Sequence, residues 1–137
     1  MVELLIGIVL GGVIIFAAKA TGFEKDRSFY PVVLIVIALY YVLFAFQSYD
    51  GIEIVFEIAI ALLFSAVAVW GHRKGLIIVV LGLLLHGIYD LTQSHIEFST
   101  DPPEWWPLFC LGFDFTLAVG LMLTTYILKK DNLKFNR

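Results

Sequence analysis

Apolar residues run almost unbroken through five stretches of the chain, and short polar segments separate these stretches. The stretches comprise residues 2–20, 31–47, 52–70, 76–94 and 108–128. A helix of about 20 residues rises roughly 30 Å, which is the thickness of the hydrocarbon core of a bilayer. The pattern therefore predicts an all-α, polytopic transmembrane helix bundle of five spans that forms one domain over residues 1–137.

The composition agrees with this pattern. Hydrophobic residues make up 61% of the chain and charged residues 15%, and the mean hydropathy is +0.93. A soluble domain is roughly 45–50% apolar and 25% charged. A chain of 137 residues cannot hide so much apolar surface inside itself, so we expect the lipid bilayer to be its main partner.

The first stretch differs from a secretory signal peptide, because its basic residue, Lys19, follows the apolar run and does not precede it. Gly7 and Gly11 within it form a GxxxG pair, which is typical of closely packed transmembrane helices. This pair predicts a homo-oligomer that is held together through the Gly7/Gly11 face.

Charged residues are unevenly divided between the connecting segments. All nine lysines and arginines fall in or beside the first connector, the third connector or the C-terminal tail that ends at Arg137. With five spans, these places share one side of the membrane. The other side receives acidic residues such as Asp50, Glu97 and Glu104. The positive-inside rule then places the N-terminus outside and the C-terminus in the cytoplasm.

Four ionisable residues interrupt the apolar stretches, namely Glu57, His86, Asp90 and Asp114. Each lies roughly 6–12 Å below the outer surface when the helical rise is counted from the span ends. Taken singly, each has a structural interpretation, such as a buried histidine that is bonded to a carbonyl group. Charged groups inside a membrane are costly, however, so the four together predict one outward-facing functional site.

Carboxylates and an imidazole at one depth must take up protons or hold a cation. No lysine or arginine lies at that depth. We therefore expect Glu57, His86, Asp90 and Asp114 to bind a divalent metal ion, for which zinc or iron suits the mixed nitrogen and oxygen ligands.

The same site has an enzymatic interpretation. His86, Asp90 and Asp114 are then the catalytic candidates, and Tyr40, Tyr89 and Trp105 are candidates for substrate binding. The tyrosines are also common packing residues, and Trp105 is equally typical of an interfacial aromatic belt.

Three functional classes remain open from these residues. The first is a metal or polar-ligand site, with or without enzymatic activity. The second is a subunit of a proton- or cation-coupled transporter or channel, and the third is an accessory membrane protein whose polar residues hold helices together. Nucleic acid is not expected as a partner, because the basic residues follow membrane topology and form no groove-binding patch.

The run His86-Gly87-Ile88-Tyr89-Asp90 stands near the end of one apolar stretch, and a loop rich in proline and tryptophan and a further acidic stretch follow it. This arrangement resembles a family of small bacterial integral membrane proteins of unknown function that carry an HGxYD motif. The likeness covers about the C-terminal half of the chain. It implies a bacterial inner-membrane location and no particular activity.

Overall fold

The computed structural model describes residues 1–97 and 99–135, and these residues form five α-helices and no β-strand. The helices are α1 (Val2–Thr21), α2 (Phe29–Ser48), α3 (Gly51–Lys74), α4 (Leu76–Thr92) and α5 (Trp106–Phe135). Two short 3-10 helices, η1 (Phe23–Lys25) and η2 (Gln93–His95), lie in the connecting segments. The all-α prediction is confirmed. Arg137 of the basic tail lies outside the described residues.

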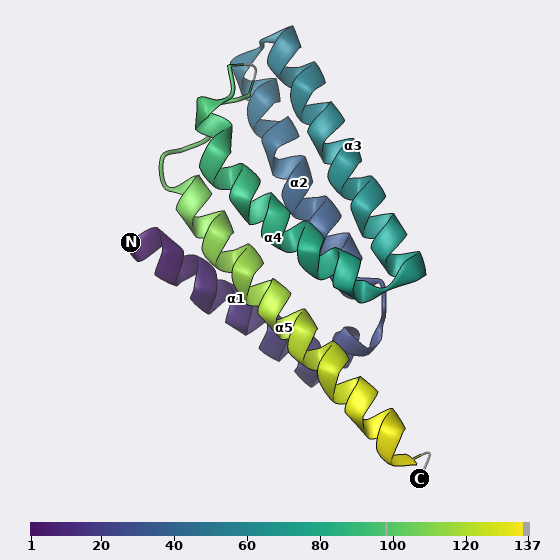
Figure 1. The fold of residues 1–137 in the computed structure, drawn as a ribbon. Helices are drawn as coiled ribbons and strands as arrows, with labels where there is room; N and C mark the ends of the chain where they lie inside the picture. Colours follow the sequence, from purple (N-terminus) through teal and green to yellow (C-terminus); the bar gives the residue numbers. More distant parts are fainter. Residues whose placement is uncertain (98, 136–137) are drawn as a thin grey trace.

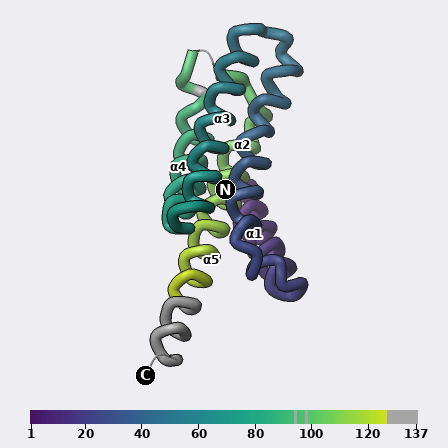
Figure 2. The backbone as a smooth tube through the Cα atoms, turned by 90° about the vertical axis from the view of Figure 1, so that its right-hand side faces the viewer, coloured from purple at the N-terminus to yellow at the C-terminus, as the bar shows by residue number. Residues whose placement is uncertain are grey.

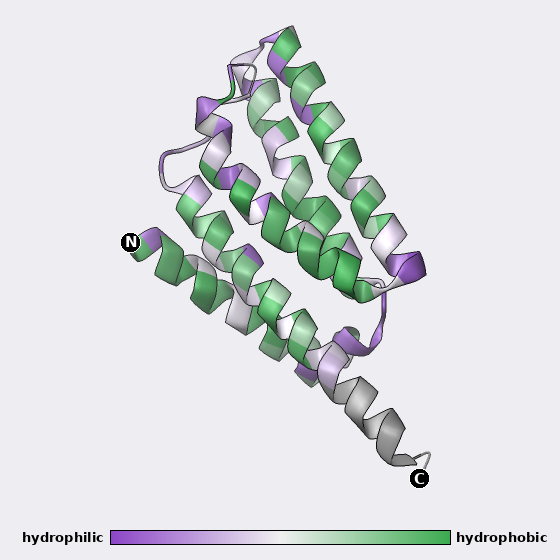
Figure 3. Ribbon diagram, viewed as in Figure 1, coloured by the Kyte–Doolittle hydropathy of each residue, from purple (hydrophilic) through white to green (hydrophobic). Residues whose placement is uncertain are grey.

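Four of the helices are long and apolar enough to cross a membrane, namely α1, α2, α3 and the Trp106–Tyr126 part of α5. Helix α4 is equally apolar but has 17 residues, so it rises roughly 25 Å, near the lower limit for a span. Figure 3 shows apolar residues along all five helices, with polar residues gathered mainly at the connecting segments. The chain thus has the helices of a multi-pass membrane protein.

The largest departures of the helix ends from the predicted stretches are in α3 and α5. Helix α3 continues through residues 71–74 and ends at Lys74 before Gly75, because polar side chains do not break a helix. Helix α5 begins at Trp106 and continues past 128 to Phe135. At the start of α3, Asp50 Oδ1 accepts hydrogen bonds from the backbone N–H groups of Ile52 and Glu53, which caps the helix.

The helices form two groups that meet at α5. Helix α1 packs against α5, and α5 packs in turn against α4, whereas α2 pairs with α3 and α3 with α4. Figures 1 and 2 show α1 and α5 as an inclined pair beside the other three helices. The core lies between α2, α3, α4 and α5 and includes the fully buried Leu34, Leu83, Leu117 and Leu121.

Glycines let α1 and α5 approach closely. A Cβ atom at Gly7 would collide with the carbonyl oxygen of Phe109, and one at Gly112 would collide with that of Leu4. Gly11 faces Thr116 in the same way, with an added Cβ only 2.9 Å from the Thr116 Cβ. The Gly7/Gly11 face, which was expected to meet a second copy, is therefore covered by α5 of the same chain. Homo-oligomerisation stays a prediction.

We expect Gly7→Ala to destabilise the protein by about 1–3 kcal/mol, because the added methyl group meets backbone that cannot move aside. Gly12→Ala is the matched control, since nothing lies within 4 Å of a Cβ at that position of the same helix. Thermal unfolding of both variants in detergent micelles measures the difference. Equal melting temperatures for the two variants would contradict this packing of α1 on α5.

Candidate functional site

Three residues near the end of α4 share one buried face. His86, Tyr89 and Asp90 are separated by three and four positions, which places them on one side of a helix. His86 and Asp90 are 1% and 0% exposed. Asp114 of α5 is also 0% exposed and lies opposite them. The site therefore lies between α4 and α5, away from solvent and from lipid.

The His86 ring joins the two aspartates. His86 Nδ1 lies 2.7 Å from Asp114 Oδ2 and 3.4 Å from Asp90 Oδ2. The Tyr41 hydroxyl of α2 donates a hydrogen bond of 2.7 Å to Asp90 Oδ1. Potential ligand atoms of His86, Asp90 and Asp114 all lie within 4.8 Å of one another. The three side chains, hereafter the His86 group, could hold one metal ion.

Gly87 allows α5 to come this close to α4. A Cβ atom at Gly87 would lie 3.2 Å from Leu111 Cδ1 and 3.6 Å from the Cβ of Asp114. The closest atom is the end of the flexible Leu111 side chain, so a small residue would require a slight shift of Leu111, whereas a bulky residue would disturb the contact between α4 and α5.

Hydrogen-bonding capacity remains free within the His86 group. A hydrogen on Nδ1 can point at only one oxygen, and the closer Asp114 Oδ2 accepts it. His86 Nε2, Asp90 Oδ2 and Asp114 Oδ1 are buried and have no hydrogen-bond partner among the described residues. Buried polar atoms without partners are uncommon in native proteins, and an ion or a functional role is a frequent reason for them.

Glu57 of α3 lies outside the His86 group, although the sequence placed it in the same set of ligands. Its Oε1 accepts hydrogen bonds from Ser99 Oγ at 2.7 Å and from the backbone N–H of Thr100 at 3.1 Å. Its Oε2 accepts one from the Tyr89 hydroxyl at 2.8 Å. Three donors thus satisfy the Glu57 carboxylate, and it binds the loop before α5 to the bundle.

Sequence reasoning missed Ser99 and Thr100 as the partners of Glu57. Neither residue lies in a periodic segment, so the sequence carries no signal that would pair them with a residue in α3. Gln93 belongs to the same network, because its side-chain amide lies 3.0 Å from Ser99 Oγ, whose single hydrogen is shared with the closer Glu57. Phe64 was also missed, and its ring stands edge-on to His86 at a centroid distance of 4.9 Å.

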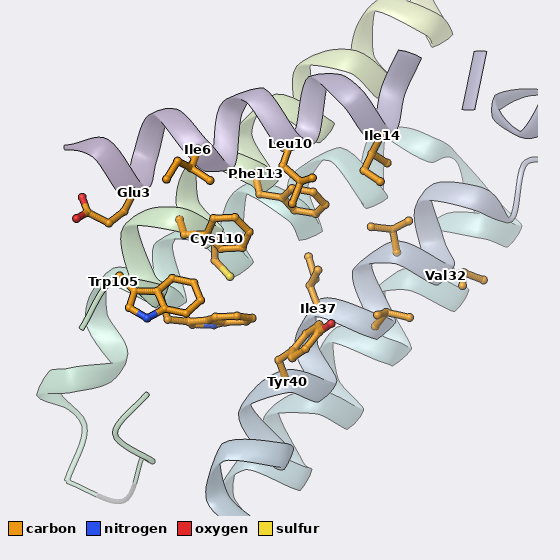
Figure 4. Close-up of a pocket in the computed structure, with 14 residues that line it drawn as sticks. Glu3, Ile6, Leu10, Ile14, Val32, Ile37, Tyr40, Trp105, Cys110 and Phe113 are labelled. Carbon is orange, nitrogen blue, oxygen red and sulfur yellow. The ribbon is translucent and has the colours of Figure 1, made fainter. Parts of the chain in front are cut away.

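The candidates for substrate binding lie in two different places. Tyr89 is buried and bonded to Glu57, whereas Tyr40 and Trp105 line an apolar groove between α1, α2 and α5 (Figure 4). Cys110 also lines this groove and lies one helical turn before Asp114. Cys110 therefore belongs both to the lining of the groove and to the turn of α5 before Asp114.

No protein-family model, no curated protein and no solved structure matches this chain. The interpretation of the site therefore depends on its geometry and chemistry.

We expect Glu57→Ala to release the loop before α5, because the substitution removes the acceptor of the buried Thr100 backbone N–H and the closest acceptor of Ser99 Oγ. A buried donor left without an acceptor costs about 1–3 kcal/mol. Hydrogen exchange of the Thr100 backbone amide measures the release directly. Tyr89→Phe removes one of the three donors and should leave that amide protected. Unchanged exchange at Thr100 in the Glu57→Ala protein would show that Glu57 does not fix the loop.

Proposed function

We propose that this chain is a membrane protein whose His86, Asp90 and Asp114 bind one divalent cation. The observation that carries the proposal is the meeting of two carboxylates and one imidazole, from two helices, in a fully buried position. No lysine or arginine among the described residues forms an ion pair with either aspartate. A cation would offset two negative charges that are otherwise costly in a membrane.

The chemistry of the ligands favours a transition metal. One imidazole nitrogen and two carboxylate oxygens form a mixed set that suits zinc, iron or manganese better than calcium, which prefers oxygen ligands alone. The three residues come from α4 and α5, so a bound ion would also join these helices. Metal binding should for this reason stabilise the fold.

A second candidate function is proton binding and relay. The observation in its favour is the continuous series of polar contacts from Tyr41 through Asp90 and His86 to Asp114. A proton-coupled transporter also needs a path to the other membrane surface. In that direction α5 continues with Leu117 and Leu121, both 0% exposed, and the helix carries no ionisable side chain there. This apolar layer favours binding over conduction.

An enzymatic function is a weaker candidate than cation binding alone, because the His86 group is buried. A hydrolase or oxidase needs water and substrate at the metal, whereas His86 is almost wholly buried. The apolar groove that Cys110 lines is a space that a lipid-like substrate could enter.

We expect protein purified without chelator to contain close to one equivalent of zinc, iron or manganese by elemental analysis. His86→Ala and Asp114→Asn should each lower metal affinity at least tenfold, as the loss of one ligand does. Glu57→Gln is the control that keeps the metal, because Glu57 lies outside the His86 group. A metal competes with a proton for His86, so affinity should also fall as the pH is lowered.

If the His86 group binds and relays protons and holds no metal, the same experiments should give different results. The protein would bind no metal at any pH, and Asp114→Asn would change its proton uptake. Absence of metal from both purified and metal-titrated protein would overturn the metal proposal.

We further propose that all five helices span the membrane, with the N-terminus outside, and that the chain resides in a bacterial inner membrane. The α2–α3 turn and the loop before α5 lie at one end of the molecule, and the α3–α4 turn lies at the other with η1 (Figure 1). The basic Lys25, Arg73 and Lys74 belong to that second end. This arrangement supports the orientation that the positive-inside rule predicts.

Cysteine labelling in intact cells tests the orientation. In a Cys110→Ala background we expect Asp101→Cys to react with a membrane-impermeant maleimide from outside. Lys74→Cys, which is equally exposed in the structure, should react only after the cells are permeabilised. Labelling of both positions from outside, or of Lys74→Cys alone, would contradict the proposed orientation.

A further inference from the structure

A large groove opens between α1, α2 and α5, and Cys110 is one of the residues that line it. It encloses about 570 Å³, which is within the usual range for small-molecule sites. Its walls are formed almost entirely by aliphatic and aromatic side chains from the three helices (Figure 4). Helices α1 and α2 do not pack against each other along it, so the groove is open to the surrounding lipid.

The groove has the length of one lipid leaflet. Along α1 its lining extends from Glu3 to Ile14, and along α2 from Tyr40 back to Val32. Eleven residues of α1 rise roughly 16 Å, and half of a hydrocarbon core is about 15 Å thick. An extended acyl chain from one leaflet therefore matches the groove in length and in polarity.

The mouth of the groove differs from its interior. The Trp106 ring is tilted against Tyr40 at a centroid distance of 5.0 Å and stands edge-on to Trp105 at 5.4 Å, and Phe109 completes the cluster. Glu3 is the one charged residue that lines the groove. Its Oε2 accepts a hydrogen bond from the amino group of Met1, and a carboxylate has capacity for further donors.

Aromatic faces and a carboxylate attract ammonium groups, through cation–π interaction and through charge, and they do not attract phosphate. No lysine or arginine lines the groove among the described residues, and the ammonium group of Met1 beside it is paired with Glu3. We propose that the groove binds one phospholipid that carries an amine in its headgroup, of the ethanolamine or choline class. The acyl chain occupies the groove, and the ammonium group contacts the aromatic cluster and Glu3. This inference does not depend on the metal proposal.

The headgroup is the decisive part of this proposal. A lipid chain gains no hydrophobic free energy when it moves from the bilayer into an apolar groove, because both surroundings are equally apolar. Packing in the groove can hold the chain, but only the mouth can distinguish one phospholipid class from another. Selectivity for the headgroup is therefore the property to measure.

Native mass spectrometry of the protein in mild detergent tests the proposal, with phosphatidylethanolamine and phosphatidylglycerol of identical chains as probes. We expect at least fivefold preference for the ethanolamine lipid. Glu3→Gln should reduce that preference while binding of the acyl chain continues. Glu3 is partly exposed and its only described side-chain bond is to Met1, so this variant should fold normally.

Filling the groove provides the second arm of the experiment. Val36→Trp places an indole inside the groove and should lower retention of the ethanolamine lipid at least fivefold. Val55→Trp is the matched control on the lipid-facing side of α3, where Val55 is 68% exposed and lines no described pocket. Equal binding of the two lipids by the unmodified protein, or equal retention by the two tryptophan variants, would overturn the proposal.

Discussion

Two carboxylates and an imidazole meet between α4 and α5 in a layer that neither water nor lipid reaches, and much of the bundle is arranged to hold them there. The contact of 2.7 Å between His86 and Asp114 requires α4 and α5 to approach closely, which Gly87 allows. Tyr41 of α2 supplies a hydrogen bond to Asp90. Charged groups left unpaired in such a place would be costly, so the positions of three helices depend on this one group of side chains.

Glu57 is a third buried carboxylate, and its role differs from that of the two aspartates. It binds the loop before α5 through Ser99 and Thr100, and it reaches α4 through Tyr89. Tyr89 and Asp90 are consecutive residues, and one contacts Glu57 while the other contacts Tyr41 and belongs to the His86 group. The last turns of α4 thus connect the loop before α5 to the His86 group, and a shift of the loop would move the residues of this group.

Helix α1 is held against α5 by a different kind of packing. Helices α1 and α5 pack through glycines that allow their backbones to approach, because hydrophobic burial does not drive association between helices inside lipid. Helix α1 leaves a groove against α2 that only an apolar occupant can fill. The chain therefore has a buried polar site between α4 and α5 and an apolar groove between α1, α2 and α5.

The sequence by itself determined the five apolar helices, because long apolar runs without breaking residues form continuous helices. It also placed His86 and Asp90 on one face of α4, since four residues make about one turn. Only the tertiary structure decided which helices are neighbours and which way each face points. The tertiary structure also showed that Glu57 lies outside the His86 group and that Gly7 and Gly11 pack against α5. The reason is that a span surrounded by lipid is apolar on every side, so periodicity does not reveal its inward face.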